Sequence, residues 1–297
     1  MSAAQRKARL SSQVMEDPDE LLSRVLDFAQ AHSGIEAVVQ TGSRARGDRV
    51  DALSDLDIEL IGPAAVELVG DDEWPGTIAD VLISVHLANE GPDAPDWPTY
   101  LVVFTYGRKI DFTLAGTERI ERMTRYGLDG LYQRGYLVRL DKTGVTRGLP
   151  ASSMTPPERS LPDSEKFAMN QREFWFEATQ VPIYLARGDL WPAGLREAEM
   201  RSLLLTMLEW NVLARSHHAV DVWHDGHHLD EWLPERYRER IATTHTRYDA
   251  TDMLGGLRSL VDLYADVAAE TSRLVSAELL DLRTRVHAHI TAVMNET

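Results

Sequence analysis

Two kinds of hydrophobic periodicity divide the chain into two halves. In the first half, short apolar runs of strand length alternate with polar turns. We predict strands at residues 35–40, 56–61, 81–87, 101–106 and 110–114, and an edge strand at 136–140. In the second half, apolar positions recur at helical spacing. We predict helices there at residues 163–187, 194–217, 230–243, 250–272 and 277–295.

Helix-start signals add two helices to the first half. Asp17 is placed to cap a helix whose first residue is Pro18, and Gly34 is placed to end it. Thr117 is expected to cap a short helix that runs through Tyr126. The sequence therefore predicts an α+β fold, a mixed sheet with flanking helices, followed by a helical bundle.

A stretch rich in proline, serine, threonine and glycine separates the halves, at residues 142–164. Such composition is typical of a linker. We therefore expect two domains, at residues 16–145 and 160–297.

Composition narrows the classes of function. The chain has 297 residues and a net charge of −16, which disfavours nucleic acid and favours cationic partners. It has no cysteine, which excludes disulfides and thiolate chemistry and suits a reducing cytoplasm. No apolar run approaches the roughly 20 residues that a membrane span needs, so we expect no membrane partner. We also expect a monomer.

Candidate chemistry begins with a glycine–serine pair that precedes two aspartates. Gly42 and Ser43 follow one predicted strand, and Asp55 and Asp57 open the next. Alternation along a strand places Asp55 and Asp57 on the same face. Paired carboxylates suit Mg²⁺, and a glycine–serine turn offers N–H groups and a hydroxyl to a phosphate. The combination predicts a nucleotide–metal site.

A third carboxylate, Asp111, interrupts the apolar strand at 110–114. A polar side chain there needs a partner. If this strand lies antiparallel to the strand at 56–61, Asp111 comes beside Asp55 and Asp57. Three carboxylates can hold one or two Mg²⁺ ions, and the third can accept the proton of an attacking hydroxyl. We therefore expect Asp111 to act as metal ligand and base.

This constellation resembles the DNA polymerase β-like nucleotidyltransferases, and within them the aminoglycoside 6-adenylyltransferases, which modify streptomycin. Three further segments are similar to motifs of that family: Gly107–Leu114 to "R-I-D-L-T-L", Glu173–Trp191 to "N-E-F-W-W … Y-V-A-K-G-L-W", and Met207–Asn211 to "M-L-E-W". The resemblance runs over most of residues 20–275 in the same order.

The resemblance implies a polymerase β-like nucleotidyltransferase domain at residues 16–145 and a helical domain at 160–297 that closes the cleft over the substrate. It implies ATP as co-substrate, with Mg²⁺ on Asp55, Asp57 and Asp111 and the phosphates at Gly42 and Ser43. Arg44 follows this pair and is our preferred further phosphate contact, ahead of Arg46. The chain departs from the family at His227 and His228, where a lysine is expected.

Acidic and aromatic residues of the second half are candidates for binding the acceptor. Glu209 and Glu177 could pair with ammonium or guanidinium groups of a cationic drug. Trp175 could offer a ring, although aromatic residues at helical spacing more often belong to a core. Five histidines between 217 and 228 do not follow a zinc-ligand spacing, so we favour a solvated loop over a zinc site.

The leading hypothesis is an adenylyltransferase that moves AMP from ATP to a hydroxyl of a streptomycin-like aminoglycoside, releases pyrophosphate and so inactivates the antibiotic. One alternative is a nucleotidyltransferase acting on a protein or another small metabolite. Another is a non-catalytic, antitoxin-like module that only binds nucleotide.

Overall fold

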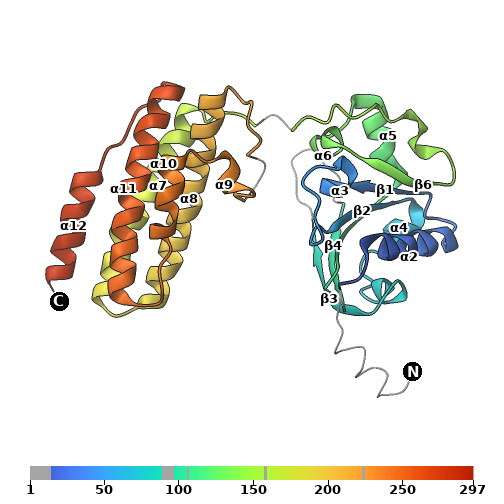
Figure 1. The fold of residues 1–297 in the computed structure, drawn as a ribbon, viewed down its shortest axis with the longest axis horizontal. Helices are drawn as coiled ribbons and strands as arrows, with labels where there is room; N and C mark the ends of the chain where they lie inside the picture. The colour runs from blue at the N-terminus through green and yellow to red at the C-terminus, as the bar shows by residue number, and fades with distance from the viewer. Residues whose placement is uncertain (1–14, 89–96, 106, 157–158, 223–224, 297) are drawn as a thin grey trace, which may run out of the picture. The chain divides into compact units, whose positions relative to one another are not determined.

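The computed structural model describes residues 15–88, 97–105, 107–156, 159–222 and 225–296. By its internal contacts the chain divides into two units, Met1–Pro157 and Glu158–Thr297. The first contains the sheet and the second is helical, as Figure 1 shows. An α+β fold with a mixed sheet and a helical C-terminal region is thereby confirmed. In the described residues, no helix combines the length and apolarity that a membrane crossing requires.

The first unit is built on a six-stranded mixed sheet in the order β3-β4-β5-β2-β1-β6. Its strands are β1 (Ala37–Thr41), β2 (Leu56–Ile61), β3 (Val81–Leu87), β4 (Thr99–Phe104), β5 (Lys109–Ala115) and β6 (Leu137–Asp141). The predicted strands all appear, with ends that shift by a few residues; Tyr106 lies outside the described residues.

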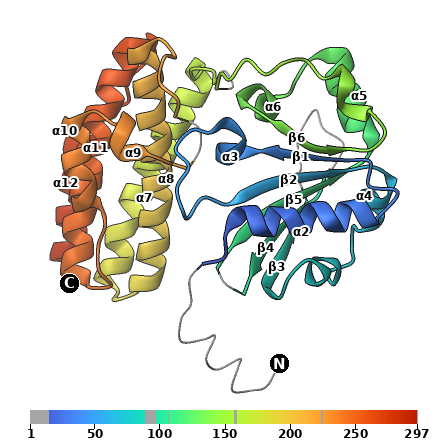
Figure 2. The same cartoon turned by 45° about the vertical axis from the view of Figure 1, so that its right-hand side comes forward.

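Helices cover both faces of this sheet. The helical segments of this unit are α2 (Pro18–Ala31), α3 (Gly42–Arg46), α4 (Pro63–Glu67), η1 (Trp74–Thr77), α5 (Thr117–Tyr126), α6 (Gly130–Arg134) and η2 (Val145–Gly148). The apolar side of α2 packs with η1 against one face, visible in Figure 2. Residues of α5 and α6 pack against the other face, over β1 and the ends of β2 and β5. As predicted, the Asp17 carboxylate caps α2 and accepts from the Asp19 N–H at 2.8 Å.

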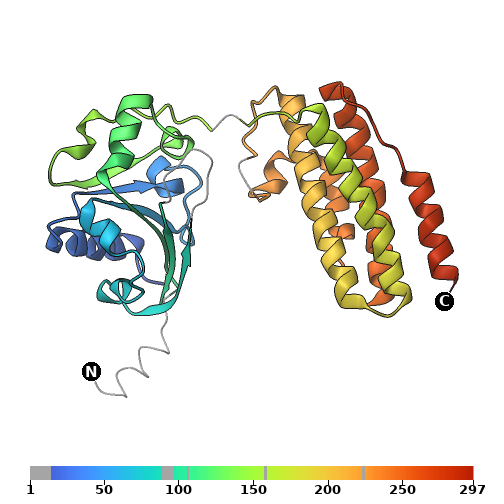
Figure 3. The same cartoon turned by 180° about the vertical axis from the view of Figure 1, so that it is seen from behind.

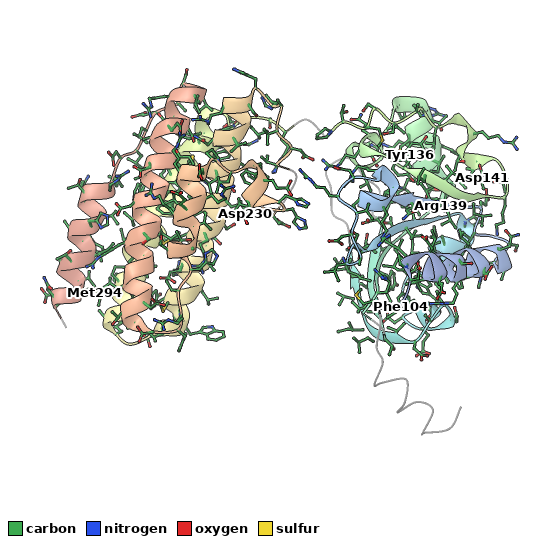
Figure 4. The ribbon with its side chains drawn as sticks, viewed as in Figure 1. Phe104, Tyr136, Arg139, Asp141, Asp230 and Met294 are labelled. Atoms are coloured by element: carbon green, nitrogen blue, oxygen red, sulfur yellow. The ribbon has the colours of Figure 1, made fainter. Side chains whose placement is uncertain are left out.

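The edge strand β6 ends in charged residues, labelled in Figure 4. Arg139 donates to the side-chain oxygen of Gln40 at 2.7 Å. Asp141 accepts from the backbone N–H groups of the turn that begins η2, at Gly144, Val145 and Thr146. Charged groups of this kind protect an exposed sheet edge from pairing with other chains.

One prediction about the sheet is wrong. β5 runs parallel to β2, with Asp57 opposite Asp111, whereas we expected an antiparallel pair. Parallel neighbours require a long crossover, and the chain supplies one between Ile61 and Lys109 that contains α4, η1, β3 and β4. The proximity of Asp111 to Asp57, which the antiparallel arrangement was meant to provide, is nevertheless present.

The second unit is a helical bundle around a large apolar core, seen from behind in Figure 3. Its helices are α7 (Ser164–Ala186), α8 (Leu190–Ser216), α9 (Leu229–Trp232), α10 (Glu235–Ile241), η3 (Ala242–Thr244), α11 (Ala250–Val275) and α12 (Arg283–Asn295). The single helix predicted at 230–243 is divided at Pro234, which holds Leu233 in an extended conformation. The last helix begins at Arg283 rather than 277.

Candidate active site

The site begins where β1 ends and the short helix α3 starts at Gly42. Gly42 has φ of 71°, and a Cβ built on it would lie 1.7 Å from Oδ2 of Asp57. Only glycine lets the backbone lie against this carboxylate in that conformation. The N–H groups of the first turn of α3 have no partner within the helix, which suits them to a phosphate. Ser43, the next residue, is half-buried.

Two neighbouring strands bring the three predicted carboxylates together. Asp57 lies opposite Thr41 of β1 and opposite Asp111 of β5. Asp55 precedes β2 by one residue and lies on the same side as Asp57 because of the strand alternation. Neighbouring strands are about 4.8 Å apart, so the carboxyl groups of Asp57 and Asp111 face one shared space.

The carboxylates perturb one another electrostatically. Burial, together with repulsion from Asp55 and then Asp111, raises the pKa of Asp57 to about 6. Burial also raises the pKa of Asp111, although Lys109 opposes this shift. Oδ1 of Asp111 is buried without a hydrogen-bond partner. Like charges crowded at a partly buried point, with an unsatisfied oxygen, are typical of a site that works on an ion or a proton.

Lys109 is a member of the site that our sequence analysis missed. Its Nζ lies 2.8 Å from Oδ2 of Asp111 and 3.1 Å from Oδ2 of Asp55. A signal was present, because Lys109 stands two residues before Asp111 on one strand and so shares its face. The contact with Asp55 depends on the pairing of β5 with β2, which the sequence does not show.

The chemistry of the donor set suits a divalent cation such as Mg²⁺. Carboxylate oxygens are its preferred protein ligands, and the unsatisfied oxygen of Asp111 is available for one. As the side chains stand, no three acidic or histidine groups converge closely enough to hold an ion anywhere in the part of the chain that the structure describes. Ion binding by these aspartates would therefore need changes of side-chain rotamer.

The arginines near the site hold its loop in place. Arg44 donates to the carbonyl oxygens of Ser54 and Asp51, each at 3.0 Å. Arg108, which is buried, donates to the carbonyl oxygen of Ala52 at 2.9 Å. These contacts fix the chain that leads into Asp55. Arg44 thus has a structural role in the loop, and its contact with phosphate stays a prediction.

Behind the carboxylates, a buried ion pair anchors β2. Glu59, two residues after Asp57, accepts from Arg119 at 2.7 and 2.8 Å and from the Tyr132 hydroxyl at 2.8 Å. Asp129 lies 3.1 Å from the same guanidinium. Every charge of this group therefore has a partner, and the group joins β2 to α5 and α6.

The three candidate acceptor-binding residues lie in the helical unit, and each has a structural partner there. Trp175 is buried and donates from its indole N–H to the carbonyl oxygen of Leu280 at 2.8 Å. Glu177 pairs with Arg196 at 2.8 Å, and Glu209 forms an ion pair with Arg159 at 3.1 Å. Packing is the evident role of Trp175, and contact of these residues with an acceptor stays a prediction.

The loop where the family is expected to carry a lysine lies before α9. Nδ1 of His228 lies within hydrogen-bond distance of Oε1 of Glu231, at 3.1 Å, and the Trp232 indole donates to the His227 carbonyl oxygen at 2.8 Å. His224, another member of the histidine-rich stretch, lies outside the described residues.

A short glycine–serine helix beside carboxylates on two neighbouring strands is the arrangement of a nucleotidyltransferase. The family model for streptomycin adenylyltransferase matches residues 15–293, so the chain belongs to this family and is a nucleotidyltransferase enzyme. It is 24% identical over 242 residues to the aminoglycoside 6-adenylyltransferase of Bacillus subtilis (strain 168), with 78% of this chain and 82% of that protein covered.

Two solved structures are similar over most of the chain. One is an aminoglycoside 6-adenyltransferase from Bacillus subtilis, with a TM-score of 0.45, 18% identity and coverage of 94% of this chain and 98% of that chain. The other is a nucleotidyltransferase-like protein from Exiguobacterium sibiricum, with a TM-score of 0.30, 10% identity and coverage of 94% and 90%.

Proposed function

We propose that this protein transfers AMP from ATP to a hydroxyl of a streptomycin-like aminoglycoside in a Mg²⁺-dependent reaction, and that this transfer inactivates the antibiotic. The observation that carries the proposal is the group of three carboxylates beside Gly42, where burial and then repulsion between carboxylates raise the pKa of Asp57. Membership of the adenylyltransferase family supports ATP as the nucleotide.

In this proposal the first turn of α3 binds the triphosphate. The N–H groups that follow Gly42, together with the Ser43 hydroxyl, donate to phosphate oxygens. Asp55, Asp57 and Asp111 would hold Mg²⁺, which neutralises phosphate charge and lowers the pKa of the attacking hydroxyl. By holding such an ion, these carboxylates would help to position the α-phosphate.

Asp111 would act as the general base. Its carboxylate can accept the proton of the acceptor hydroxyl through the oxygen that the ion does not bind, and its raised pKa makes it a stronger base than an ordinary aspartate. The acceptor oxygen then forms a bond to the α-phosphorus while the bond to pyrophosphate breaks. The products are the adenylylated acceptor and pyrophosphate, with the proton on Asp111.

A cationic acceptor fits the charge of the protein. The net charge of −16 attracts polycations and repels nucleic acids. We propose that Glu209 and Glu177 contribute to the acceptor site, with Glu209 binding an ammonium or guanidinium group in exchange for Arg159, and that Trp175 supports this site through packing.

The direct test is mass spectrometry of streptomycin after incubation with the protein, ATP and Mg²⁺. We expect the drug to gain one AMP group with the wild type and with Glu67→Gln, a matched loss of one exposed charge in the same unit. We expect no gain with Asp57→Asn. If neither streptomycin nor other aminoglycosides are modified, while label from ATP enters protein or another metabolite, the acceptor in the proposal is wrong.

A further inference from the structure

The contacts of Lys109 bear on how many metal ions the site binds. Its ammonium uses Oδ2 of Asp111, at 2.8 Å, and Oδ2 of Asp55, at 3.1 Å. Oδ1 of Asp111 stays buried and without a hydrogen-bond partner. Each of these two carboxylates therefore has one oxygen bound to an internal cation and the other available.

Two-metal centres hold their ions about 3.5–4 Å apart. A carboxylate that bridges two such ions with its two oxygens has none left for an ammonium. In this protein Lys109 engages one oxygen on each of two aspartates, so neither can bridge two ions in this two-oxygen mode while the ammonium stays in place.

The charge of the centre leads to the same result. Before a nucleotide binds, the three carboxylates and the ammonium carry a net charge of −2, which a single divalent ion neutralises. Without Lys109 the net charge of these protein groups would be −3, and one divalent ion would leave a negative charge. Arg46 adds a weaker electrostatic attraction to Asp57, separate from the two contacts that Lys109 makes with Asp55 and Asp111.

We propose that Lys109 takes the place of a second metal ion, so that the site binds one divalent cation together with the nucleotide. Asp57 and the free oxygens of Asp55 and Asp111 receive this ion, and the ammonium keeps Asp55 and Asp111 close together. Lys109 is thus a positioning residue that sets metal stoichiometry. The inference rests on the proposed nucleotidyl transfer, because it concerns the ions that accompany the nucleotide.

The test counts bound Mn²⁺ by electron paramagnetic resonance in the presence of an ATP analogue with a methylene group between the α- and β-phosphates, which cannot be cleaved there. We expect one Mn²⁺ per wild-type protein and one for Lys109→Arg, which keeps the charge. We expect two for Lys109→Met. Without nucleotide, Lys109→Met should bind its first Mn²⁺ at least about tenfold more tightly than the wild type, because a nearby positive charge is gone.

Lys166→Met is the matched control, since it removes an exposed lysine from the helical unit and should bind Mn²⁺ as the wild type does. Circular dichroism checks that each variant is folded, and Lys109→Gln replaces Lys109→Met if the latter is not. Two Mn²⁺ in the wild type, no Mn²⁺ at all, or equal binding by wild type and both neutral variants would overturn the inference.

The result is separable from the acceptor chemistry. If one Mn²⁺ binds and no aminoglycoside is modified, the proposed acceptor fails and the inference about Lys109 stands. If streptomycin is adenylylated and the wild type binds two Mn²⁺, the proposed function stands and the inference fails.

Discussion

The carboxylate centre of the first unit carries an excess of negative charge, whereas the candidate acidic residues of the helical unit are paired with arginines. Asp55, Asp57 and Asp111 are three acids for one lysine, and the pKa of Asp57 is raised to about 6. Glu177 and Glu209 each pair with an arginine of their own unit. A charge that is fully paired stabilises the fold or leaves its stability unchanged. Unbalanced charges lower the stability of the fold, and they occur where an ion or a proton must bind.

The largest effect is expected for Asp57→Asn, which removes one of the unbalanced charges of the carboxylate centre. We expect transfer activity to fall at least about a thousandfold, because a metal ligand is lost. In EDTA the same variant should be more stable than the wild type at pH 8. The shift in the pKa of Asp57 from 3.8 to about 6 corresponds to about 3 kcal/mol.

The stability difference between wild type and Asp57→Asn should depend on pH. Well below pH 3.8 Asp57 is protonated in both the folded and the unfolded chain, so the aspartate carries no penalty there. The penalty grows as the pH rises from 3.8 to about 6, where only the unfolded chain is ionised, and it is complete above pH 6. Thermal unfolding of wild type and Asp57→Asn should therefore give nearly equal midpoints at about pH 3 and the largest difference above about pH 7. A wild type that is more stable than the variant at pH 8 would contradict the assignment.

Gly42→Ala should have the next largest effect. A Cβ at Gly42 would overlap Oδ2 of Asp57, so we expect this carboxylate to be displaced and activity to fall by about a hundredfold. Gly47→Ala is the matched control, because Gly47 also has a left-handed φ, of 68°, and nothing lies near its Cβ position. Equal activity of the two variants in steady-state assays would mean that contact with Asp57 does not matter.

Glu59→Gln tests a fully paired charge, the ion pair of Glu59 with Arg119, on the same strand as Asp57. Glu59 is almost fully buried, and loss of its charge would leave Asp129 as the remaining carboxylate partner of the Arg119 guanidinium. We expect the free energy of unfolding to fall by about 3 kcal/mol in urea titrations. Glu67→Gln should change it by less than about 0.5 kcal/mol. A loss for Glu59→Gln as small as that of the control would show that the buried ion pair is not stabilising.

The smallest effect is expected for Trp175→Phe in the helical unit, which distinguishes a packing role of the indole from contact with the acceptor. The substitution keeps most of the ring and removes the hydrogen bond to Leu280, so we expect a loss of about 1 kcal/mol in stability. If Trp175 acts through packing alone, the KM for the acceptor should not change. An increase in that KM at unchanged stability would instead place the indole in the acceptor site.

Local patterns along the chain were sufficient for most of the elements. The apolar run at Val81–Leu87 has the predicted bounds, and the Asp17 cap forms as expected. The helix predicted through Tyr126 also forms, but its N-cap is Gly116, without a side-chain cap, rather than Thr117. These features depend on neighbours within a few residues, whose effects are visible in the order of residue types. The break at Pro234 was also visible in the sequence, but the helical periodicity on both sides outweighed it in the prediction.

The order of residues was enough to identify Gly42, Ser43 and the aspartates as members of the candidate site. Strand alternation was enough to place Asp55 and Asp57 on one face. Only the tertiary structure decided that β5 runs parallel to β2, and that Lys109 bonds to Asp55, 54 residues away. It also decided that Glu209 meets Arg159. Such contacts depend on which strands and helices become neighbours, and burial and chain connectivity across the whole unit select those neighbours, since no local pattern specifies them.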